Sequence, residues 1–291
     1  MLHHCKTADH GQKDHNMGVR AENSTDYVHS DEPNLLNLHK AMGYNNFGQP
    51  TIRTTGSNVQ FAIDIALGNV SGLTNVYRHG FNPSCANNTE ETLWTGSVLY
   101  PWSTWDGAGA VTIDFTSSSV SDTMQLLVEG LDANYVAQSE TITLNGTNTV
   151  TTTKTYRRIN DITNNTSTSV VGAISGKLHG TATTVAYMNA GYNHSQNGFY
   201  TVPAGYTALL FQGGTNIGKG NDGLLQFKYK LYGKSFITAH VVMLYQDSYI
   251  YPFTFPLALP EKTDLDVTLI ASNAGTSCAC HYNMLLVNNS Y

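Results

Sequence analysis

The sequence predicts an all-β protein, built as two antiparallel β-sandwich domains of jelly-roll or immunoglobulin-like type behind an extended N-terminal arm. Charged residues make up only 12% of the 291 residues, and Thr, Ser, Asn and 26 Gly take their place. The 17 Tyr and 10 Phe are residues that favour pleated strands over helices. Turn-forming residues recur about every 8 to 14 positions, as in sandwiches and barrels. These three observations together predict strands joined by tight turns.

Residues 1–58 are predicted to form the arm, because neither a helical nor a strand period persists there. Six of the 11 histidines lie in this stretch. One short helix is expected over 35–42, since Ser30 and Pro33 are typical of a helix start and Gly43 follows its end. We expect the arm to become ordered when it lies on a partner surface.

The first sandwich is predicted over 59–188. The Asn145-Gly146 pair predicts a type I′ hairpin, because both residue types tolerate positive φ. This hairpin would join the strands on its two sides. The expected strands are 112–115, 124–129, 135–144, 149–159, 167–175 and 183–188.

The second sandwich is predicted over 199–291, after a linker at 189–198 that is rich in turn formers and almost free of aliphatic residues. Strand 224–232 alternates, so that Lys228 and Lys230 share one face, and its expected partner is 236–245. The other expected strands are 199–202, 206–212, 250–255, 265–271 and 281–287.

Charge and hydropathy exclude several classes of function. The net charge is −6, whereas a general nucleic-acid binder needs a basic surface to neutralise phosphates. No apolar run approaches the roughly 18 residues of a membrane span, and no secretory signal is visible at the start. We therefore expect neither nucleic acid nor membrane as a partner. The four cysteines are too few and too scattered for a disulfide framework, so reduced thiols are expected.

Motifs of catalysis and of metal binding are absent from the sequence. It contains no Gly-x-Ser-x-Gly, no phosphate-binding glycine loop and no His-Glu-x-x-His. Most carboxylates fall at strand ends or turns, where they cap the backbone or meet water. In Cys278-Ala279-Cys280-His281 the two cysteines share one strand face, which favours packing over zinc binding. The prediction is a protein with no catalytic residue, no metal and no cofactor.

The candidate interaction residues fall in two groups. Trp94, Trp102 and Trp105 lie within twelve residues of each other, and they fit a core-covering loop, an interface anchor or a sugar-stacking platform. The second group consists of the apolar residues of the arm. These are Leu35, Leu36, Leu38, Met42, Tyr44 and Phe47.

Several blocks of the chain together form a fairly specific set, which covers about residues 75–291 in order. The blocks are Gly80-Phe81-Asn82-Pro83, Glu90 to Trp94, Tyr100-Pro101-Trp102, Glu129 to Tyr135, Ser139 to Gly146, Tyr200 to Ala208 and Leu259 to Val267. In these blocks the chain resembles virion structural proteins of marine tailed phages, including cyanophages and related podoviruses.

The resemblance implies a non-enzymatic structural protein of the virion, assembled in the host cytoplasm. We expect a capsid decoration or cement protein that attaches through its arm to the major capsid protein or to other virion proteins. A homo-oligomer is expected, with a trimer as one option. The alternative is a host-surface or glycan-binding module of a tail or fibre, in which the tryptophan cluster would be the platform.

Overall fold

The computed structural model describes residues 42–44, 50–52, 58–218 and 220–290. By its internal contacts the chain divides into two compact units, Met1–Ser71 and Gly72–Tyr291. Each unit is considered by itself. In the described residues, no helix has both the length and the apolar character needed to cross a membrane.

The first unit contains a small hairpin and one helix. Strands β1 (Met42–Tyr44) and β2 (Pro50–Ile52) pair antiparallel, and helix α2 spans Asn58–Ala66. Two expectations are corrected here, since Met42 lies in a strand rather than in a helix, and the residues from Val59 onward begin with a helix rather than a strand. Helix α2 ends where Gly68 takes a φ of 73°, a conformation that glycine adopts without steric cost. The rest of the expected helix, 35–41, lies outside the described residues.

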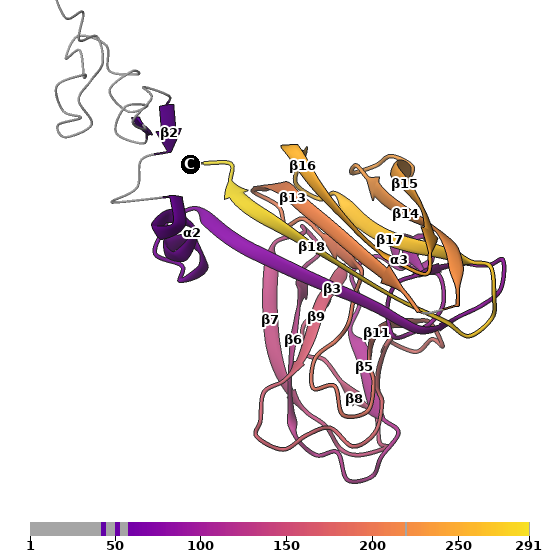
Figure 1. Ribbon diagram of the computed structural model, residues 1–291. Coiled ribbons are helices and arrows are strands. Elements are labelled where there is room, and N and C mark those ends of the chain that lie inside the picture. The colour runs from indigo at the N-terminus through magenta and orange to yellow at the C-terminus, as the bar shows by residue number, and fades with distance from the viewer. Residues whose placement is uncertain (1–41, 45–49, 53–57, 219, 291) are drawn as a thin grey trace, which may run out of the picture. The chain divides into compact units, whose positions relative to one another are not determined.

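The described residues of the second unit form four antiparallel sheets, which confirms the all-β prediction (Figure 1). Two of them contain strands from the middle of the chain. The order of the first is β11 (Thr184–Met188), β10 (Ile174–Leu178), β5 (Ile113–Ser117) and β8 (Val150–Thr151). The order of the second is β7 (Ala137–Thr143), β6 (Gln125–Leu131) and β9 (Arg158–Asn164).

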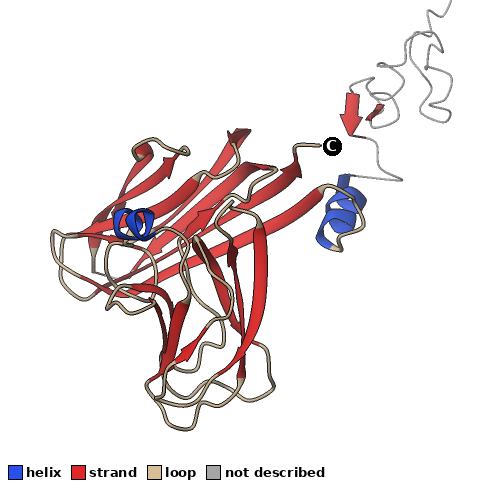
Figure 2. Ribbon diagram, turned by 180° about the vertical axis from the view of Figure 1, so that it is seen from behind, coloured by secondary structure: helices blue, strands red, loops and turns tan. Residues whose placement is uncertain are grey.

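The other two sheets combine strands from both ends of this unit. The order of the third is β12 (Phe199–Thr201), β17 (Asp264–Ala271), β14 (Asp222–Lys230) and β15 (Ile237–Tyr245), with β4 (Glu90–Thr92) also paired to β17. The order of the fourth is β16 (Ser248–Leu259), β13 (Tyr206–Ile217), β18 (Thr276–Asn288) and β3 (Leu73–Cys85). Apart from strands and loops, Figure 2 shows in this unit the short helix α3 (Trp102–Ala108).

Two hydrophobic clusters stabilise the second unit. One takes residues such as Phe115, Leu126 and Ile174 from the first two sheets, together with an aromatic group around Trp94. The other takes residues such as Leu210 and Leu269 from the third and fourth sheets. Strands β3 and β4 precede the first two sheets in the chain but pair with β18 and β17. The division into two sandwiches with a linker at 189–198 stays a prediction.

The turn at Asn145-Gly146 is present, but its type and its strands differ from the prediction. The Asn148 N–H donates to the Asn145 carbonyl at 3.0 Å, so Gly146 and Thr147 form the centre of the turn. Of these residues only Gly146, at φ 58°, has a positive φ, as in a type II′ turn rather than type I′. After the turn, β8 pairs with β5 instead of β7. The chain therefore crosses from one sheet to the other here.

Candidate functional site

Strands β15 and β16 present the most prominent run of exposed apolar side chains in the described part of the chain. Each strand is the last of its sheet, so one edge of each has no strand partner among the described residues. On them Tyr245 is 64% exposed, Ile250 61% and Phe255 85%. Ile237, Val241 and Met243 are also exposed. We refer to these six residues as the apolar edge surface.

The apolar edge surface is free of charge. Between Ile237 and Leu259 the only residue with a formal charge at neutral pH is Asp247, which lies in the turn between β15 and β16. A partner that covers these strands would therefore desolvate apolar side chains without burying a charge. Large exposed apolar areas of this kind are typical of interaction sites.

A ladder of aromatic rings connects the two strands on their inner side. The ring of His240 on β15 lies 4.4 Å from that of Tyr251 on β16, measured between centroids. Tyr251 in turn contacts Phe253 edge-to-face at 4.8 Å. Beneath the rings lies an apolar cavity of about 50 Å³, which Leu225 and Val242 also line. These contacts between the third and fourth sheets stabilise the position of both edge strands.

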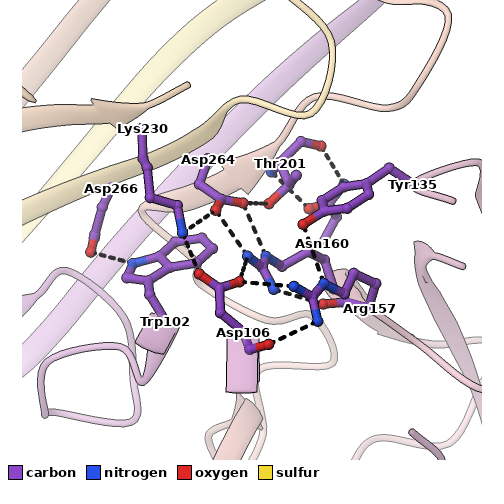
Figure 3. A network of polar contacts seen from close by, with 10 residues as sticks. Trp102, Asp106, Tyr135, Arg157, Asn160, Thr201, Lys230, Asp264 and Asp266 are labelled. Atoms are coloured by element: carbon purple, nitrogen blue, oxygen red, sulfur yellow. Dashed lines mark hydrogen bonds and ion pairs between the residues drawn. The ribbon is translucent and has the colours of Figure 1, made fainter. Parts of the chain in front are cut away.

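A buried ionic network lies elsewhere in the unit, between the second and third sheets. Arg158, at the start of β9, donates from Nε to Asp264 Oδ1 at 3.0 Å and from Nη2 to Asp264 Oδ2 at 2.9 Å. Asp106 of α3 accepts from Arg158 and, at 2.6 Å, from Lys230 of β14. Thr201 donates to Asp264 at 2.7 Å (Figure 3). Burial tends to raise the pKa of Asp106, but hydrogen bonds from Lys230 and Arg158 hold it below its usual value.

Asp266 lies two residues after Asp264 on β17, and its pKa is shifted in the opposite direction to that of Asp106. Trp102 Nε1 donates to its Oδ2 at 2.7 Å and Thr92 Oγ1 at 3.2 Å, while Oδ1 has no hydrogen-bond partner. Burial raises the pKa of this carboxyl to about 7, although the two hydrogen bonds oppose the change. Arg158, Asp264 and Asp266 are buried, and the partly exposed Asp106 is paired with Arg158 and Lys230. These groups are suited to stabilising the fold rather than to binding a substrate.

A serine, a histidine and an aspartate also meet in the structure. His194 Nε2 lies 2.9 Å from Asp161 Oδ2, and Ser195 donates to Asp161 Oδ1 at 2.5 Å. Arg78 donates to the same carboxylate at 2.8 Å. In a catalytic triad the histidine lies between serine and aspartate, whereas here both bind the aspartate directly. Ser195 is buried, and its oxygen also accepts the Ile162 N–H, so it is not activated as a nucleophile.

The thiols do not form a reactive or metal-binding group. Cys85, Cys278 and Cys280 are unpaired and buried, in agreement with the expectation of reduced cysteines. Burial raises the pKa of both Cys85 and Cys278 to about 12, so these thiols stay protonated near neutral pH. Among the residues that the structure describes, no three His, Cys, Asp or Glu side chains group as a metal site would require.

The structure places the predicted tryptophan site in the core. Trp94 and Trp105 are fully buried, and Trp102 is 6% exposed. Trp94 packs edge-to-face on Tyr100 and on Phe199, at 5.2 and 5.7 Å between centroids. The interpretation of these residues as interface anchors or as a sugar platform is therefore corrected, because no ring face is left for a partner.

The arm residues proposed for the interface are not placed by the structure. Leu35, Leu36, Leu38 and Phe47 lie outside the described residues, and of Met42 and Tyr44 only the backbone in β1 is described.

The apolar edge surface was missed in the sequence because alternating apolar residues predict one buried face. The signal that could have revealed it is the long stretch 237–259, in which both faces carry apolar residues and charge is almost absent.

Comparison with known proteins places the chain in no family. No family model matches it, and no curated protein matches it either. Among solved structures, the chain is similar to the one titled "Crystal structure of infectious bursal disease virus VP2 subviral particle". The identity is 9%, the match covers 79% of this chain and 78% of that chain, and the TM-score is 0.20.

Proposed function

We propose that this protein is a non-enzymatic structural component of a phage virion, and that it acts as a capsid decoration or cement protein. The observation that carries the proposal is the uncharged apolar edge surface on β15 and β16. The resemblance of residues 75–291 to virion structural proteins of marine tailed phages supports the same role. A protein of this role functions through repeated contact with other subunits and requires no active site.

The arrangement of polar groups supports a role without catalysis. In the described residues the buried carboxylates and cations are paired with each other or with core side chains, as in the network of Arg158 and Asp264. Ser195 and the three described thiols are buried. A catalytic centre would instead bring a reactive group and a matched base to an accessible cleft.

The finer parts of the proposal concern attachment and architecture. We propose that the arm, residues 1–58, attaches the protein to the major capsid protein or another virion protein. We also propose that the four sheets work as two sandwiches. The separation of the core into two hydrophobic clusters, each built mainly from one pair of sheets, supports this division.

A glycan-binding module of a tail or fibre is the second candidate function. It is favoured by a cleft of about 480 Å³ between β3 and the β6–β7 hairpin. The exposed ring of Tyr77 and the polar side chains of Glu129 and Gln138 line this cleft. Aromatic rings beside hydrogen-bonding groups are suited to binding sugars. This cleft takes the place of the tryptophan cluster, which is buried.

The experiment that tests the proposed function uses phage particles. Mass spectrometry of purified particles is expected to find the protein at many copies per particle. Purified full-length protein should bind particles assembled without it, and EDTA should leave the binding unchanged. Absence from the particles would overturn the proposal. Binding to a glycan array that is lost in a Tyr77→Ala variant, with no binding to particles, would favour the second candidate.

A further inference from the structure

The described strands at the ends of the four sheets differ in how their free edges are protected. Proteins prevent edge-to-edge pairing with prolines, charged side chains or very short edge strands. Strand β16 contains Pro252 and Pro256, which have no N–H to donate. Charged residues occur in β3, β7 and β9, and β8, β11 and β12 are five residues long or shorter.

Strand β15 lacks all of these protections from His240 to Tyr245. Its nine residues, Ile237–Tyr245, include no proline and no Lys, Arg, Asp or Glu. A bulge leaves Ala239 without a partner on β14, and from His240 to Tyr245 the pairing is regular. In this regular segment Val241, Met243 and Tyr245 are exposed, whereas His240 and Val242 line the inner cavity. The free edge therefore offers backbone donors and acceptors next to an apolar stripe.

We propose that the free edge of β15 pairs antiparallel with β15 of a second copy of this chain, about a twofold axis at Met243. This proposal rests on the proposed structural function and names the partner of the β15 part of the apolar edge surface. Two copies that each carry a net charge of −6 can approach here because β15 contributes no formal charge at neutral pH. A charged partner would find no opposite charge on this strand.

The sequence of β15 is self-complementary in this register. With Met243 opposite its own copy, Val241 lies opposite Tyr245 and Val242 lies opposite Leu244 of the second copy. A β-branched residue opposite an aromatic one is a favourable cross-strand pair. Pairing also satisfies the free backbone groups of both strands, so that the third sheet continues through the two copies. A trimer, one option for the homo-oligomer expected from the sequence, would need a different surface.

The test compares two exposed apolar positions in the full-length protein. Light scattering is expected to give twice the mass of the chain for the native protein and a monomer for Met243→Lys, because two lysines would face each other at the axis. Ile250→Lys on β16 is the matched control, since Ile250 is 61% and Met243 53% exposed. This control is expected to stay dimeric. Mixing Met243→Lys with Met243→Glu should restore the dimer, because opposite charges then meet.

Cross-linking gives a readout that does not depend on the charged variants. In a Cys5→Ser background, Met243→Cys should form a covalent dimer with a short thiol cross-linker, and Ile250→Cys should not. The three other cysteines are buried and do not compete. A monomeric native protein, an equal loss of dimer in Ile250→Lys or cross-linking at Ile250 alone would overturn the proposal. A monomer that still binds particles would leave the proposed function standing.

Discussion

Burial decides the chemistry of individual side chains in this protein, and Asp266 and Asp122 show two opposite results. Asp266 receives two hydrogen bonds on one oxygen and none on the other, and burial raises its pKa to about 7. Burial acts in the same direction on Asp122, but Ser117 and the N–H groups of Val171 and Gly172 hold its pKa below the usual value. The direction of the pKa shift therefore depends on the number of hydrogen-bond donors, which is two at Asp266 and three at Asp122.

We predict that the stability of the Asp266→Asn variant, compared with that of the native protein, increases as the pH rises. A raised pKa in the folded state means that the folded protein binds the proton more tightly than the unfolded chain, so the stability of the native protein falls between about pH 4 and pH 7. Asparagine cannot ionise and avoids this loss. With a shift from 3.8 to about 7, the relative gain is at most about 4 kcal/mol. Thermal melts of both proteins between pH 4 and pH 8 measure it.

Asp122→Asn is the control for this prediction, and its effect has the opposite sign. The lowered pKa of Asp122 contributes stability above the pKa of the unfolded state, and this contribution is lost as the pH falls through the folded pKa. The variant should therefore be less stable than the native protein at neutral pH and approach it in acid. If the stability of the native protein and of both variants changed with pH in the same way, this result would contradict the assigned pKa shifts.

These contacts could not be predicted from the sequence. Arg158 and Asp264 are separated by 106 positions, and no local pattern links them. The sequence predicts carboxylates at turns that cap the backbone, as Asp132 does for Asn134 and Val136, but it does not show which carboxylates become buried. The tryptophans illustrate the same limit, because their spacing fits a core and an interface equally well.

At the level of elements, the turn at Asn145–Asn148 shows what local sequence determines. The Asn-Gly pair correctly predicts where the chain turns, because glycine supplies the positive φ that the turn needs. The turn type and the partner of the next strand depend on tertiary contacts instead. The strand predicted over 149–159 is divided between β8 and the start of β9, and β8 pairs with β5 in another sheet.

We predict that Gly146→Val destabilises the protein by more than Gly180→Val. Both glycines have a positive φ, which strains a β-branched residue by roughly 1 to 3 kcal/mol. At Gly146 an added Cβ would also lie 2.7 Å from the Val120 carbonyl oxygen, whereas at Gly180 nothing lies within 4 Å. Urea unfolding of the two variants separates the steric contact from the backbone strain. Equal midpoints would show that the chain beside Val120 moves away at no cost.

At the scale of the whole molecule, composition predicts the fold class correctly, but it does not predict the sheet partners. The low content of charged residues and the high content of Thr, Tyr and Gly indicate strands throughout, and strands make up most of the second unit. The pairing of β3 with β18 joins the two ends of this unit. Contacts over such sequence distances depend on complementary buried faces. Helix α2 was missed because its apolar residues also fit a strand pattern over a short window.

We predict that removing residues 1–71 leaves the thermal transition of the remaining chain nearly unchanged and abolishes binding to particles. The second unit, Gly72–Tyr291, contains both hydrophobic clusters and all four large sheets, so its folding should need no residue of the first unit. Calorimetry and co-sedimentation with particles measure the two effects. An insoluble truncated protein would contradict the first expectation, and undiminished co-sedimentation would contradict the role of the arm.

The two prolines of β16 also affect how the protein behaves at high concentration. An open sheet edge can pair with further chains, and repeated pairing builds ribbons or amyloid-like fibres. The two long apolar edge strands of this protein belong to different sheets: β15 ends the third sheet, and β16, which contains Pro252 and Pro256 and so lacks two N–H donors, ends the fourth. With β15 occupied in the dimer, β16 is the apolar edge strand, among those described, at which further chains could add. A concentrated stock should stay clear on storage, and replacing both prolines with valine should make it gel or form fibres that bind thioflavin T.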